Sequence, residues 1–192
     1  MNSMPEVRLP PSRMMTPMPT EHEELMQQHL RDENLPEAVM PAIPIKKVLK
    51  GQKALVTGAN SGIGKAVALS LANAGADVVV NYVSRPEAAE EVVTEATLCG
   101  ANVYAHRANV AKEDEVQAMF KKMIQEFGTI DLLVNNAGLQ KDAPMDQMSL
   151  ADWQFVLDVN LTGQFLCSRE AIREFKRRGI RKEISCAAGK II

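Results

Sequence analysis

A glycine-rich stretch at residues 53–64, KALVTGANSGIG, is the feature that most constrains how this chain can fold. A short apolar run leads directly into three glycines, and an amphipathic stretch follows over residues 65–75. This order predicts a β-strand, a tight turn and a helix, which together direct backbone N–H groups and a helix N-terminus at a phosphate. In this interpretation Gly58 permits the sharp turn, Gly62 lets a diphosphate approach the backbone, and Gly64 lets the helix pack closely on the strand.

The spacing of these glycines leaves a second interpretation open. It is G-x-x-x-G-x-G, whereas the common dinucleotide fingerprint is G-x-G-x-x-G. An ordinary glycine-rich loop between a strand and a helix of an α/β protein also fits this spacing. Other parts of the chain are needed to distinguish a phosphate-binding turn from a purely structural one.

The overall composition excludes several classes of protein. The 192 residues suffice for one sizeable core, and the net charge of −2 gives no indication of binding to nucleic acids or membranes through bulk charge. No apolar run approaches the roughly 20 residues that a membrane-spanning helix needs, and we expect no secretory signal. Three cysteines and three histidines fit neither a disulfide framework nor a recognisable set of metal ligands. We therefore predict a cytoplasmic protein without a metal site.

Residues 1–50 differ in composition from the rest of the chain, because they contain eight of its ten prolines. The fixed φ angle and the missing N–H group of proline disfavour helices and paired strands over most of this segment. One exception is a capping-box pattern at residues 20–23, which predicts a short polar helix to about Asp32. We predict a proline-rich, partly disordered extension that wraps the domain or stays mobile, with binding to a partner as the alternative.

From residue 51 onward, short apolar runs alternate with stretches of helical periodicity. The run at residues 78–80 has no polar interruption, which is typical of a strand covered on both faces. Residues 84–87 and 149–152 both have the sequence pattern that starts a helix. We predict strands at residues 54–57, 77–82, 102–107, 131–134 and from 189, and helices at residues 62–74, 85–99, 112–127, from 149, and 162–178. This alternation predicts a doubly wound parallel sheet, an α/β fold of the Rossmann type, in residues 51–192.

A second motif, Asn135-Asn136-Ala137-Gly138, follows the fourth predicted strand. On its own this motif is typical of an ordinary turn. Together with residues 57–64, however, it resembles the short-chain dehydrogenase/reductase family, and the resemblance covers most of residues 51–192. Residues 81–82, 87–92 and 159–163 look most like the glucose 1-dehydrogenase-like branch of that family.

The resemblance implies a binding site for NADP or NAD. The first motif would cradle the diphosphate and the adenosine ribose, and the second would pass beside the adenosine end. Asn109 would lie near the adenine, where the family usually has an aspartate; an asparagine keeps a carbonyl acceptor and adds an NH₂ donor. The implied cofactor-binding residues are Thr57, Gly58, Asn60, Ser61, Gly62, Ile63, Gly64, Tyr82, Arg85, Asn109, Val110, Asn136, Ala137 and Gly138.

The end of the second strand indicates which dinucleotide binds. An acidic side chain there would bind the ribose 2′-OH of NAD, whereas a nearby arginine accommodates the 2′-phosphate of NADP. Residues 82–85 contain no acid, and Asp77 lies at the start of the strand. Arg85 could pair with a phosphate, although a solvated arginine at a helix start fits its position equally well. We expect NADP or the use of both dinucleotides.

The resemblance also implies a catalytic group, of which this chain carries one member. Asn160 matches the asparagine that holds a proton-relaying water in the family, whereas residue type alone would suggest a kink or a solvated position. The family's tyrosine, the lysine four residues after it and an upstream serine have no counterpart. Tyr82 and Tyr104 are the only tyrosines and neither starts a Tyr-x-x-x-Lys, while Ser185 precedes the fifth strand. We expect a C-terminally truncated fragment of a longer enzyme that is inactive as given.

Two functions follow from these observations. The first is an NAD(P)-dependent oxidoreductase that moves a hydride between nicotinamide and a small hydroxyl or carbonyl substrate, for example a sugar such as glucose. The second is a catalytically silent remnant that binds at most a dinucleotide or a partner chain. A Rossmann-like methyltransferase would share the glycine-rich loop but not its pairing with Asn-Asn-Ala-Gly.

The intact family also implies a homo-oligomer, to which the predicted helix at residues 162–178 would contribute. Its apolar side chains would equally suit packing on the sheet. They are Phe165, Ala171, Ile172 and Phe175.

Overall fold

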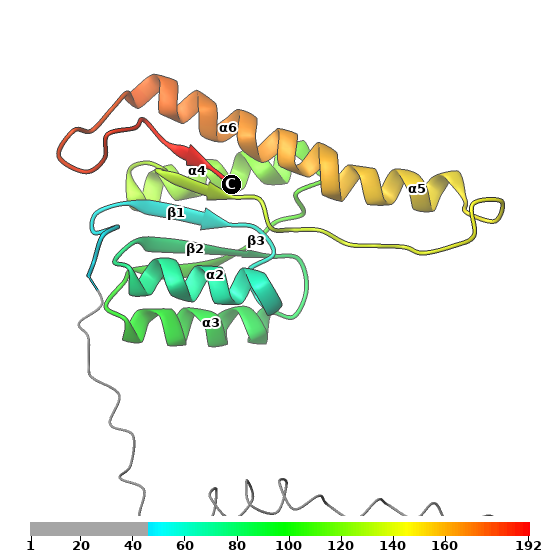
Figure 1. Ribbon diagram of the computed structural model, residues 1–192, viewed down its shortest axis with the longest axis horizontal. Helices are drawn as coiled ribbons and strands as arrows, with labels where there is room; N and C mark the ends of the chain where they lie inside the picture. Colours follow the sequence, from blue (N-terminus) through cyan, green and yellow to red (C-terminus); the bar gives the residue numbers. More distant parts are fainter. Residues whose placement is uncertain (1–45) are drawn as a thin grey trace, which may run out of the picture. The chain divides into compact units, whose positions relative to one another are not determined.

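A computed structural model describes residues 46–192 of the chain (Figure 1). The predicted proline-rich extension lies outside the described residues, apart from a largely exposed turn at residues 46–51. The division into an extension and a domain therefore stays a prediction. In the described part, no helix is long and apolar enough to cross a bilayer. No group of three or more His, Cys, Asp or Glu side chains within residues 46–192 is placed to hold a metal ion.

Five parallel strands form one sheet, and their order across it is β3-β2-β1-β4-β5. The strands are β1 (Lys53–Val56), β2 (Asp77–Tyr82), β3 (Val103–Arg107), β4 (Leu132–Val134) and β5 (Lys190–Ile191). The chain runs outward from β1 through β2 and β3, then returns to the other side of β1 and continues through β4 and β5. The predicted doubly wound sheet of the Rossmann type is confirmed.

Helices cover both faces of this sheet. α2 and α3 lie on one face, whereas α4 and α6 lie on the other (Figure 1). The helices are α2 (Gly62–Asn73), α3 (Pro86–Leu98), α4 (Glu113–Phe127), α5 (Leu150–Leu157) and α6 (Gly163–Arg178). A π-helix, η1 (Asp158–Thr162), joins α5 to α6, so that the last two predicted helices form one long rod. α5 extends beyond the carboxyl ends of the strands (Figure 1).

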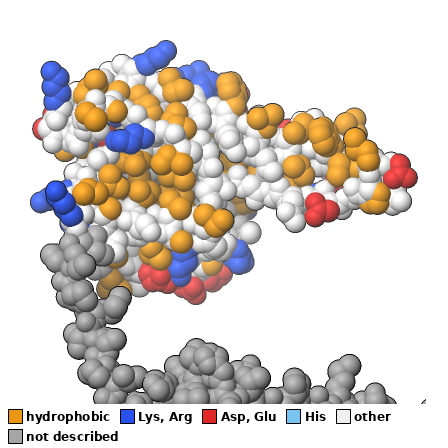
Figure 2. Space-filling model, in the orientation of Figure 1, with side chains coloured by type: hydrophobic (Ala, Val, Ile, Leu, Met, Phe, Trp, Pro, Cys, Tyr) orange, Lys and Arg blue, Asp and Glu red, His pale blue; other side chains and the backbone are white. Residues whose placement is uncertain are grey.

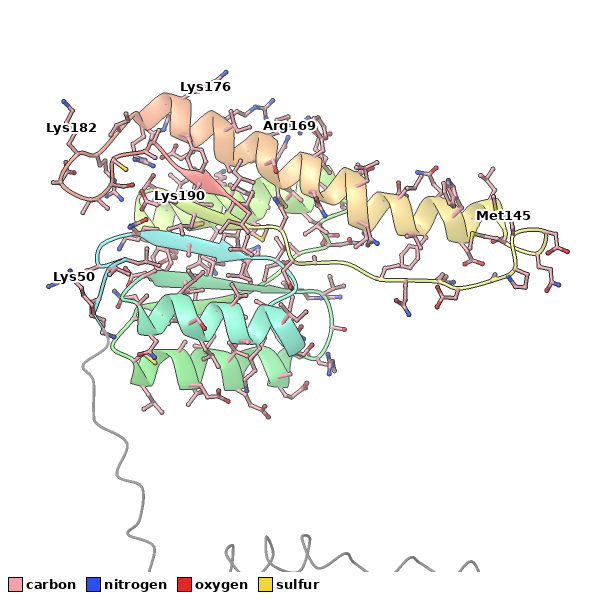
Figure 3. All side chains as sticks on the ribbon, in the orientation of Figure 1. Lys50, Met145, Arg169, Lys176, Lys182 and Lys190 are labelled. Atoms are coloured by element: carbon pink, nitrogen blue, oxygen red, sulfur yellow. The ribbon has the colours of Figure 1, made fainter. Side chains whose placement is uncertain are left out.

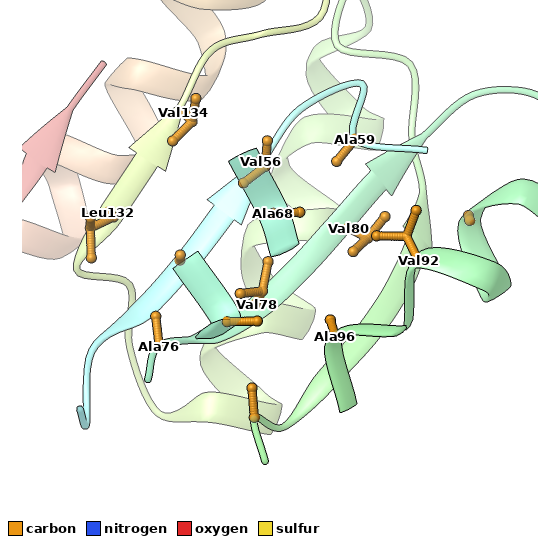
Figure 4. Close-up of a cluster of buried hydrophobic side chains, with 14 residues drawn as sticks. Val56, Ala59, Ala68, Ala76, Val78, Val80, Val92, Ala96, Leu132 and Val134 are labelled. Carbon is orange, nitrogen blue, oxygen red and sulfur yellow. The ribbon is translucent and has the colours of Figure 1, made fainter. Parts of the chain in front are cut away.

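The apolar run in β2 shows why both faces have to be covered. Val78 and Val80 belong to the cluster beneath α2 and α3 (Figure 4), while Val79 belongs to the cluster beneath α4 and α6. All three side chains are fully buried. Alternate side chains of a strand point to opposite faces, so a strand needs a continuous apolar run only where both faces are packed. In the first cluster α2 contributes the small residues Ala68 and Ala72, which let this helix lie close to the sheet.

The helix cap predicted at residues 20–23 lies outside the described residues, and the two predicted within them have different outcomes. Ser149 caps α5, because its Oγ accepts a hydrogen bond from the Asp152 N–H at 3.0 Å. The capping box predicted at residues 84–87 is wrong, because no side chain caps α3. The residue before α3 is Arg85, which has a left-handed φ of 57°, whereas a side-chain cap requires an extended residue at this position.

A buried ion cluster joins the amino ends of β1 and β4 to the end of α6. Asp131 is 3% exposed, and its carboxylate accepts hydrogen bonds from the Lys53 N–H at 2.8 Å and from Arg181 Nη2 at 2.6 Å. Arg178 Nη2 lies 3.2 Å from the second carboxylate oxygen. These donors compensate for the hydration that the carboxylate loses on burial.

Replacing Asp131 by asparagine is expected to lower the free energy of unfolding by about 3–5 kcal/mol, because two arginines then lose the charge that compensates for their partial burial. Urea unfolding followed by circular dichroism measures this change. Asp146→Asn removes the same charge from an exposed position and serves as the control, with an expected change below about 0.5 kcal/mol. A D131N protein as stable as the control would contradict the role assigned to this cluster.

Candidate functional site

A cleft of about 520 Å³ lies where the strand order reverses around β1, beyond the carboxyl ends of the strands. Open α/β sheets bind their ligands at this place, and the volume is within the range of small-molecule sites. Loops after β1, β2, β3 and β4 contribute to it, together with one side of α5 and η1. The cleft is lined by Gly58, Asn60, Ser61, Ile63, Gly64, Asn81, Val83, Ser84, Asn109, Val110, Asn136, Ala137, Gly138, Leu139, Phe155 and Val159.

The three glycines of the first loop have separate roles. Gly58 and Gly62 have positive φ angles of 60° and 55°, a conformation that favours glycine. A Cβ at Gly62 would meet nothing within 4 Å, so the backbone there is open to a ligand. A Cβ at Gly64 would collide with the Gly58 carbonyl oxygen and with Asn136 Nδ2. This geometry agrees with the predicted role of Gly58 in the turn and with the predicted close packing at Gly64. The atoms packed against Gly64 belong to loops, however, and not to a strand.

The N-terminus of α2 is suited to an anion. The first turn of α2 contains no acidic residue, whereas the first turn of α4 contains Glu113, Asp114 and Glu115. Ser61 precedes α2, and its side chain does not cap the helix. The positive end of the helix dipole and its N–H groups are therefore left without a negative side chain beside them.

Hydrogen bonds join the two sequence motifs directly. The Thr57 hydroxyl accepts hydrogen bonds from the N–H groups of Asn136 and Ala137, both at 3.0 Å. The Asn136 side chain donates in return to the carbonyl oxygens of Thr57 at 2.9 Å and Gly58 at 3.1 Å. Thr57 is 2% exposed, so these groups pair with each other instead of with water. The loops after β1 and β4 are thus held as one unit.

Asn81 lies in β2 between the glycine-rich turn and the end of β3, and it was not predicted to be a site residue. It is 1% exposed, and its Oδ1 accepts a hydrogen bond from the Gly58 N–H at 3.2 Å. Its Nδ2 donates to the carbonyl oxygens of His106 at 3.3 Å and Ala108 at 2.9 Å. This side chain therefore links the glycine-rich turn to the end of β3. Only its position at the end of a strand next to β1 could have indicated this role.

Arg85 lies at the edge of the cleft, beside the glycine-rich turn. Its Nη2 donates to Ser61 Oγ at 3.0 Å, and Asn60 Nδ2 donates to the carbonyl of Ser84 at 2.7 Å. The loop after β2 is thereby fastened to the start of α2. The left-handed conformation of Arg85 is unusual for a residue other than glycine, and such conformations are found preferentially at ligand sites.

Asn109 lines the cleft beyond β3, and Glu115 holds its backbone. The Asn109 N–H donates to Glu115 Oε2 at 2.7 Å, and Asn109 Oδ1 accepts from the Ala111 N–H at 3.0 Å. The hydrogen bond from Asn109, followed by that from Lys112, holds the pKa of the Glu115 carboxyl below its usual value. Glu115 is therefore charged at neutral pH.

Asn160 holds the loop that follows the second motif. It belongs to the π-helix η1, and its Oδ1 accepts from the Leu139 N–H at 2.9 Å while its Nδ2 donates to the Leu139 carbonyl at 2.7 Å. A Cβ at Gly138 would lie 3.5 Å from Asn160 Oδ1, so this side chain stands directly behind the cleft wall. π-Helical turns often occur at functional sites. Both polar atoms of the Asn160 side chain serve to position the backbone.

The structure brings most of the predicted cofactor residues into the cleft and leaves others outside its lining. Tyr82 packs against the core cluster beneath α2 and α3, on the opposite face from its neighbour Asn81. Thr57 and Asn160 stand behind the lining, and Gly62 and Arg85 lie at its margin. The predicted residues that line the cleft are Gly58, Asn60, Ser61, Ile63, Gly64, Asn109, Val110, Asn136, Ala137 and Gly138.

Tyr104 has none of the properties of a general acid or base at the cleft. It does not line the cleft, and its ring packs edge-on against Phe127 with 5.2 Å between ring centroids. Its hydroxyl has no hydrogen-bond partner within residues 46–192. Burial, and next the charge of Glu126, raise the pKa of Tyr104. Acid–base catalysis by a phenol requires the opposite shift.

Comparison with known sequences identifies relatives of this chain. The sequence profile of the short chain dehydrogenase family matches residues 52–191. A 3-oxoacyl-[acyl-carrier-protein] reductase of Synechocystis sp. is 51% identical over 121 residues, which cover 63% of this chain and 49% of the relative. The enzyme of the same description from Staphylococcus aureus is 45% identical over 127 residues, which cover 66% of this chain and 52% of the relative. The chain thus spans about half the length of the curated relatives that it matches.

Solved structures agree with these matches. A short-chain type dehydrogenase/reductase from Mycobacterium marinum superimposes with a TM-score of 0.68 at 37% identity, and the match covers 74% of this chain and 55% of that one. A short chain dehydrogenase from Burkholderia cenocepacia, solved in complex with NADP, superimposes with a TM-score of 0.64 at 36% identity. That match covers 66% of this chain and 51% of the other.

Replacing Thr57 by valine is expected to destabilise the protein by about 1–3 kcal/mol, because the N–H groups of Asn136 and Ala137 lose their acceptor. Chemical unfolding measures the difference. Thr57→Ser keeps the hydroxyl and is the matched control, and we expect it to retain most of the stability. Equal stability of the two variants would show that the hydroxyl does not hold the loops together.

Replacing Gly64 by alanine is expected to lower the melting temperature, because the new methyl group has no room beside the Gly58 carbonyl and Asn136. Gly138→Ala is the control from the same cleft, since its methyl group would make only ordinary contact with Asn160. Calorimetry of both variants tests this difference. Similar melting temperatures would contradict the packing described at Gly64.

Proposed function

The chain belongs to the short-chain dehydrogenase family, and on this premise we propose that its cleft binds a nicotinamide dinucleotide for an oxidoreductase reaction. The observation that carries the proposal is the joining of the glycine-rich turn to the Asn-Asn-Ala-Gly loop at the point where the strand order reverses. Gly62 exposes backbone at this point, next to the positive end of α2. These features suit a diphosphate.

The two halves of the sheet give the dinucleotide an orientation. With the diphosphate at the N-terminus of α2, one nucleoside half extends over β2 and β3 and the other over β4 and β5. We assign the adenosine half to the β2–β3 side, where Asn109 and Val110 line the cleft. The nicotinamide half then lies beyond the Asn-Asn-Ala-Gly loop, beside Leu139 and Val159. Asn160 acts there through Leu139, as a positioning residue.

We propose that NADP is preferred to NAD. No acidic side chain of the β2 loop lines the cleft, so nothing there repels a 2′-phosphate. Arg85 already reaches the glycine-rich turn through Ser61, and its guanidinium can pair with a phosphate in a bidentate manner. The Burkholderia cenocepacia relative solved with NADP supports this choice.

Arg85→Ala is expected to weaken NADPH binding at least about tenfold and to leave NADH binding almost unchanged, because only NADPH carries the phosphate that the guanidinium pairs with. Nicotinamide fluorescence in a titration gives both dissociation constants. Arg173→Ala removes an exposed arginine from α6 and is the control. A hundredfold preference of the unmodified chain for NADH over NADPH would contradict the assignment.

The substrate class is also part of the proposal. We propose a hydride transfer between nicotinamide and a hydroxyl or carbonyl carbon of a small molecule. The curated relatives described above are named as 3-oxoacyl-[acyl-carrier-protein] reductases, which favours a 3-oxoacyl thioester over the glucose suggested by the resemblance of residues 81–82, 87–92 and 159–163. Both substrates can be compared directly in one assay of NADPH oxidation or NADP reduction.

Dinucleotide binding without turnover is the second candidate function. The observation in its favour is that Tyr82 and Tyr104 are both held in strands, and neither side chain lines the cleft. A titration with NADPH, with S-adenosylmethionine as the negative control, tests binding, and the oxidation of NADPH by acetoacetyl thioester tests turnover. Binding with turnover supports the first candidate and binding without turnover supports the second. Binding of S-adenosylmethionine alone would contradict both.

We further propose that the protein forms a homo-oligomer through the rod of α5, η1 and α6. Leu161, Phe165 and Ile172 are 64%, 58% and 42% exposed on it. Ala171 and Phe175, by contrast, pack against the core, so the apolar residues predicted for this helix divide between two faces. α5 and the loop before it project from the domain, and hydrophobic side chains cover much of this projection (Figure 2). Met145 lies in the loop, at the far end of the projection (Figure 3). Sedimentation analysis of the unmodified chain and of Phe165→Ser tests whether the protein forms a homo-oligomer through this rod.

A further inference from the structure

Asn81 is an amide at a position where a strand packed on both faces normally carries an apolar side chain. It lies on the same face of β2 as Val79, which belongs to the cluster beneath α4 and α6. Both side chains are almost fully buried. Burial of an amide is costly unless its polar atoms are hydrogen-bonded. The partners of the Asn81 side chain therefore indicate what this residue does.

Asn81 holds two consecutive residues of the glycine-rich turn. Its Oδ1 accepts a hydrogen bond from the Gly58 N–H at 3.2 Å, and its main-chain carbonyl accepts from the Ala59 N–H at 2.8 Å. Gly58 has a left-handed φ of 60°, so the chain bends sharply where the side chain holds it. The position of the turn relative to β2 is therefore fixed by this one residue.

The other end of the same carboxamide holds the chain that leaves β3. Nδ2 donates to the carbonyl of Ala108 at 2.9 Å and to that of His106 at 3.3 Å. Ala108 comes directly before Asn109 and Val110, which line the cleft. One side chain thus reaches from the loop after β1 to the loop after β3, and it sets the separation between them.

A carboxamide has both of the atoms that this position needs. The Gly58 N–H can only donate and the Ala108 carbonyl can only accept, so the side chain between them needs an acceptor at one end and a donor at the other. A carboxylate of the same shape has no donor and would direct a negative charge at the Ala108 carbonyl. A leucine of similar shape has neither atom.

We infer that Asn81 is a positioning residue for dinucleotide binding, and this inference rests on the proposed function. The loop after β1 is assigned to the diphosphate and the residues after β3 to the adenosine half, so a dinucleotide bridges the two loops that Asn81 joins. Loops that are fixed before binding lose little conformational freedom when the ligand arrives, which lowers the dissociation constant. Asn81 acts through Gly58 and Ala108, because its own side chain is almost fully buried.

The test compares Asn81→Leu with Thr129→Val in calorimetric titrations of the full chain with NADP. Thr129 is also buried, and its hydroxyl donates to Glu174 Oε1 at 3.0 Å, so T129V loses a buried hydrogen bond away from the cleft. We expect N81L to weaken NADP binding at least about tenfold and T129V to bind NADP as the unmodified chain does. Circular dichroism shows whether each variant is folded. A folded N81L with the NADP affinity of T129V would overturn the inference.

Asn81→Asp decides the question if N81L does not fold. Burial beside the Ala108 carbonyl raises the pKa of a carboxyl group, and the protonated group can again donate to Ala108 and accept from Gly58. We expect the ratio of Kd for N81D to Kd for the unmodified chain to fall about tenfold between about pH 8 and about pH 6. A ratio that does not change with pH would overturn the inference.

Other groups that respond to this change of pH are common to both proteins. His106 is the partner of Asn81 in the ladder between β2 and β3, and burial, followed by the charge of Lys122 on α4, lowers its pKa. His106, Lys122 and the phosphates of NADP are present in both titrations, so their own effects cancel in the ratio.

Failure of the proposed function has a different signature. If the unmodified chain and T129V bound no NADP, the proposed function would be wrong, and this inference would be wrong with it. If both bound NADP and N81L bound it equally well, only this inference would be wrong.

Discussion

The hydrogen bonds between Thr57 and Asn136 are the interaction on which the cleft depends. β1 and β4 are neighbours in the sheet, but their chains separate after the backbone hydrogen bond from the Thr57 N–H to the Val134 carbonyl at 3.0 Å. The Thr57 hydroxyl and the Asn136 carboxamide continue the connection past the strand ends. A doubly wound sheet always opens at this point, because one loop turns towards each face. Side chains have to supply the contacts that the backbone ladder can no longer make.

Much of the fold could be predicted from the sequence, because its determinants are local. A run such as residues 78–80 reveals a strand packed on both faces, and the glycines that end helices have positive φ angles at Gly75, Gly100 and Gly128. The capping box at residues 84–87 was a wrong prediction, because the left-handed backbone of Arg85 is fixed by contacts with the glycine-rich turn. The π-helix was not predicted either. It adds a residue to a turn without disturbing the apolar periodicity on either side.

The candidate site could be predicted as far as it consists of two loops and of Asn109 and Val110 after β3. Residues 58–64 and 136–138 have sequences that determine their own conformations, and they supply half of the residues that line the cleft. Asn81 was missed because its partners, Gly58 and Ala108, are distant in sequence and meet only when three strands align. Phe155 enters the cleft from a helix whose placement depends on η1. The positions of Asn81 and Phe155 at the cleft depend on tertiary structure, and the spacing of residues in the sequence does not predict them.

The π-helix sets the rotational phase of the long rod formed by α5, η1 and α6. One residue of an α-helix corresponds to about 100° of rotation about its axis. α6 turns Leu166 and Ala171 towards the sheet, while α5 turns Phe155 towards the cleft. Deleting one residue from η1 would leave both helices chemically intact but would rotate one against the other by that angle, moving Phe155 away from the cleft. The number of residues in this segment is therefore as much a structural parameter of the cleft as their identity.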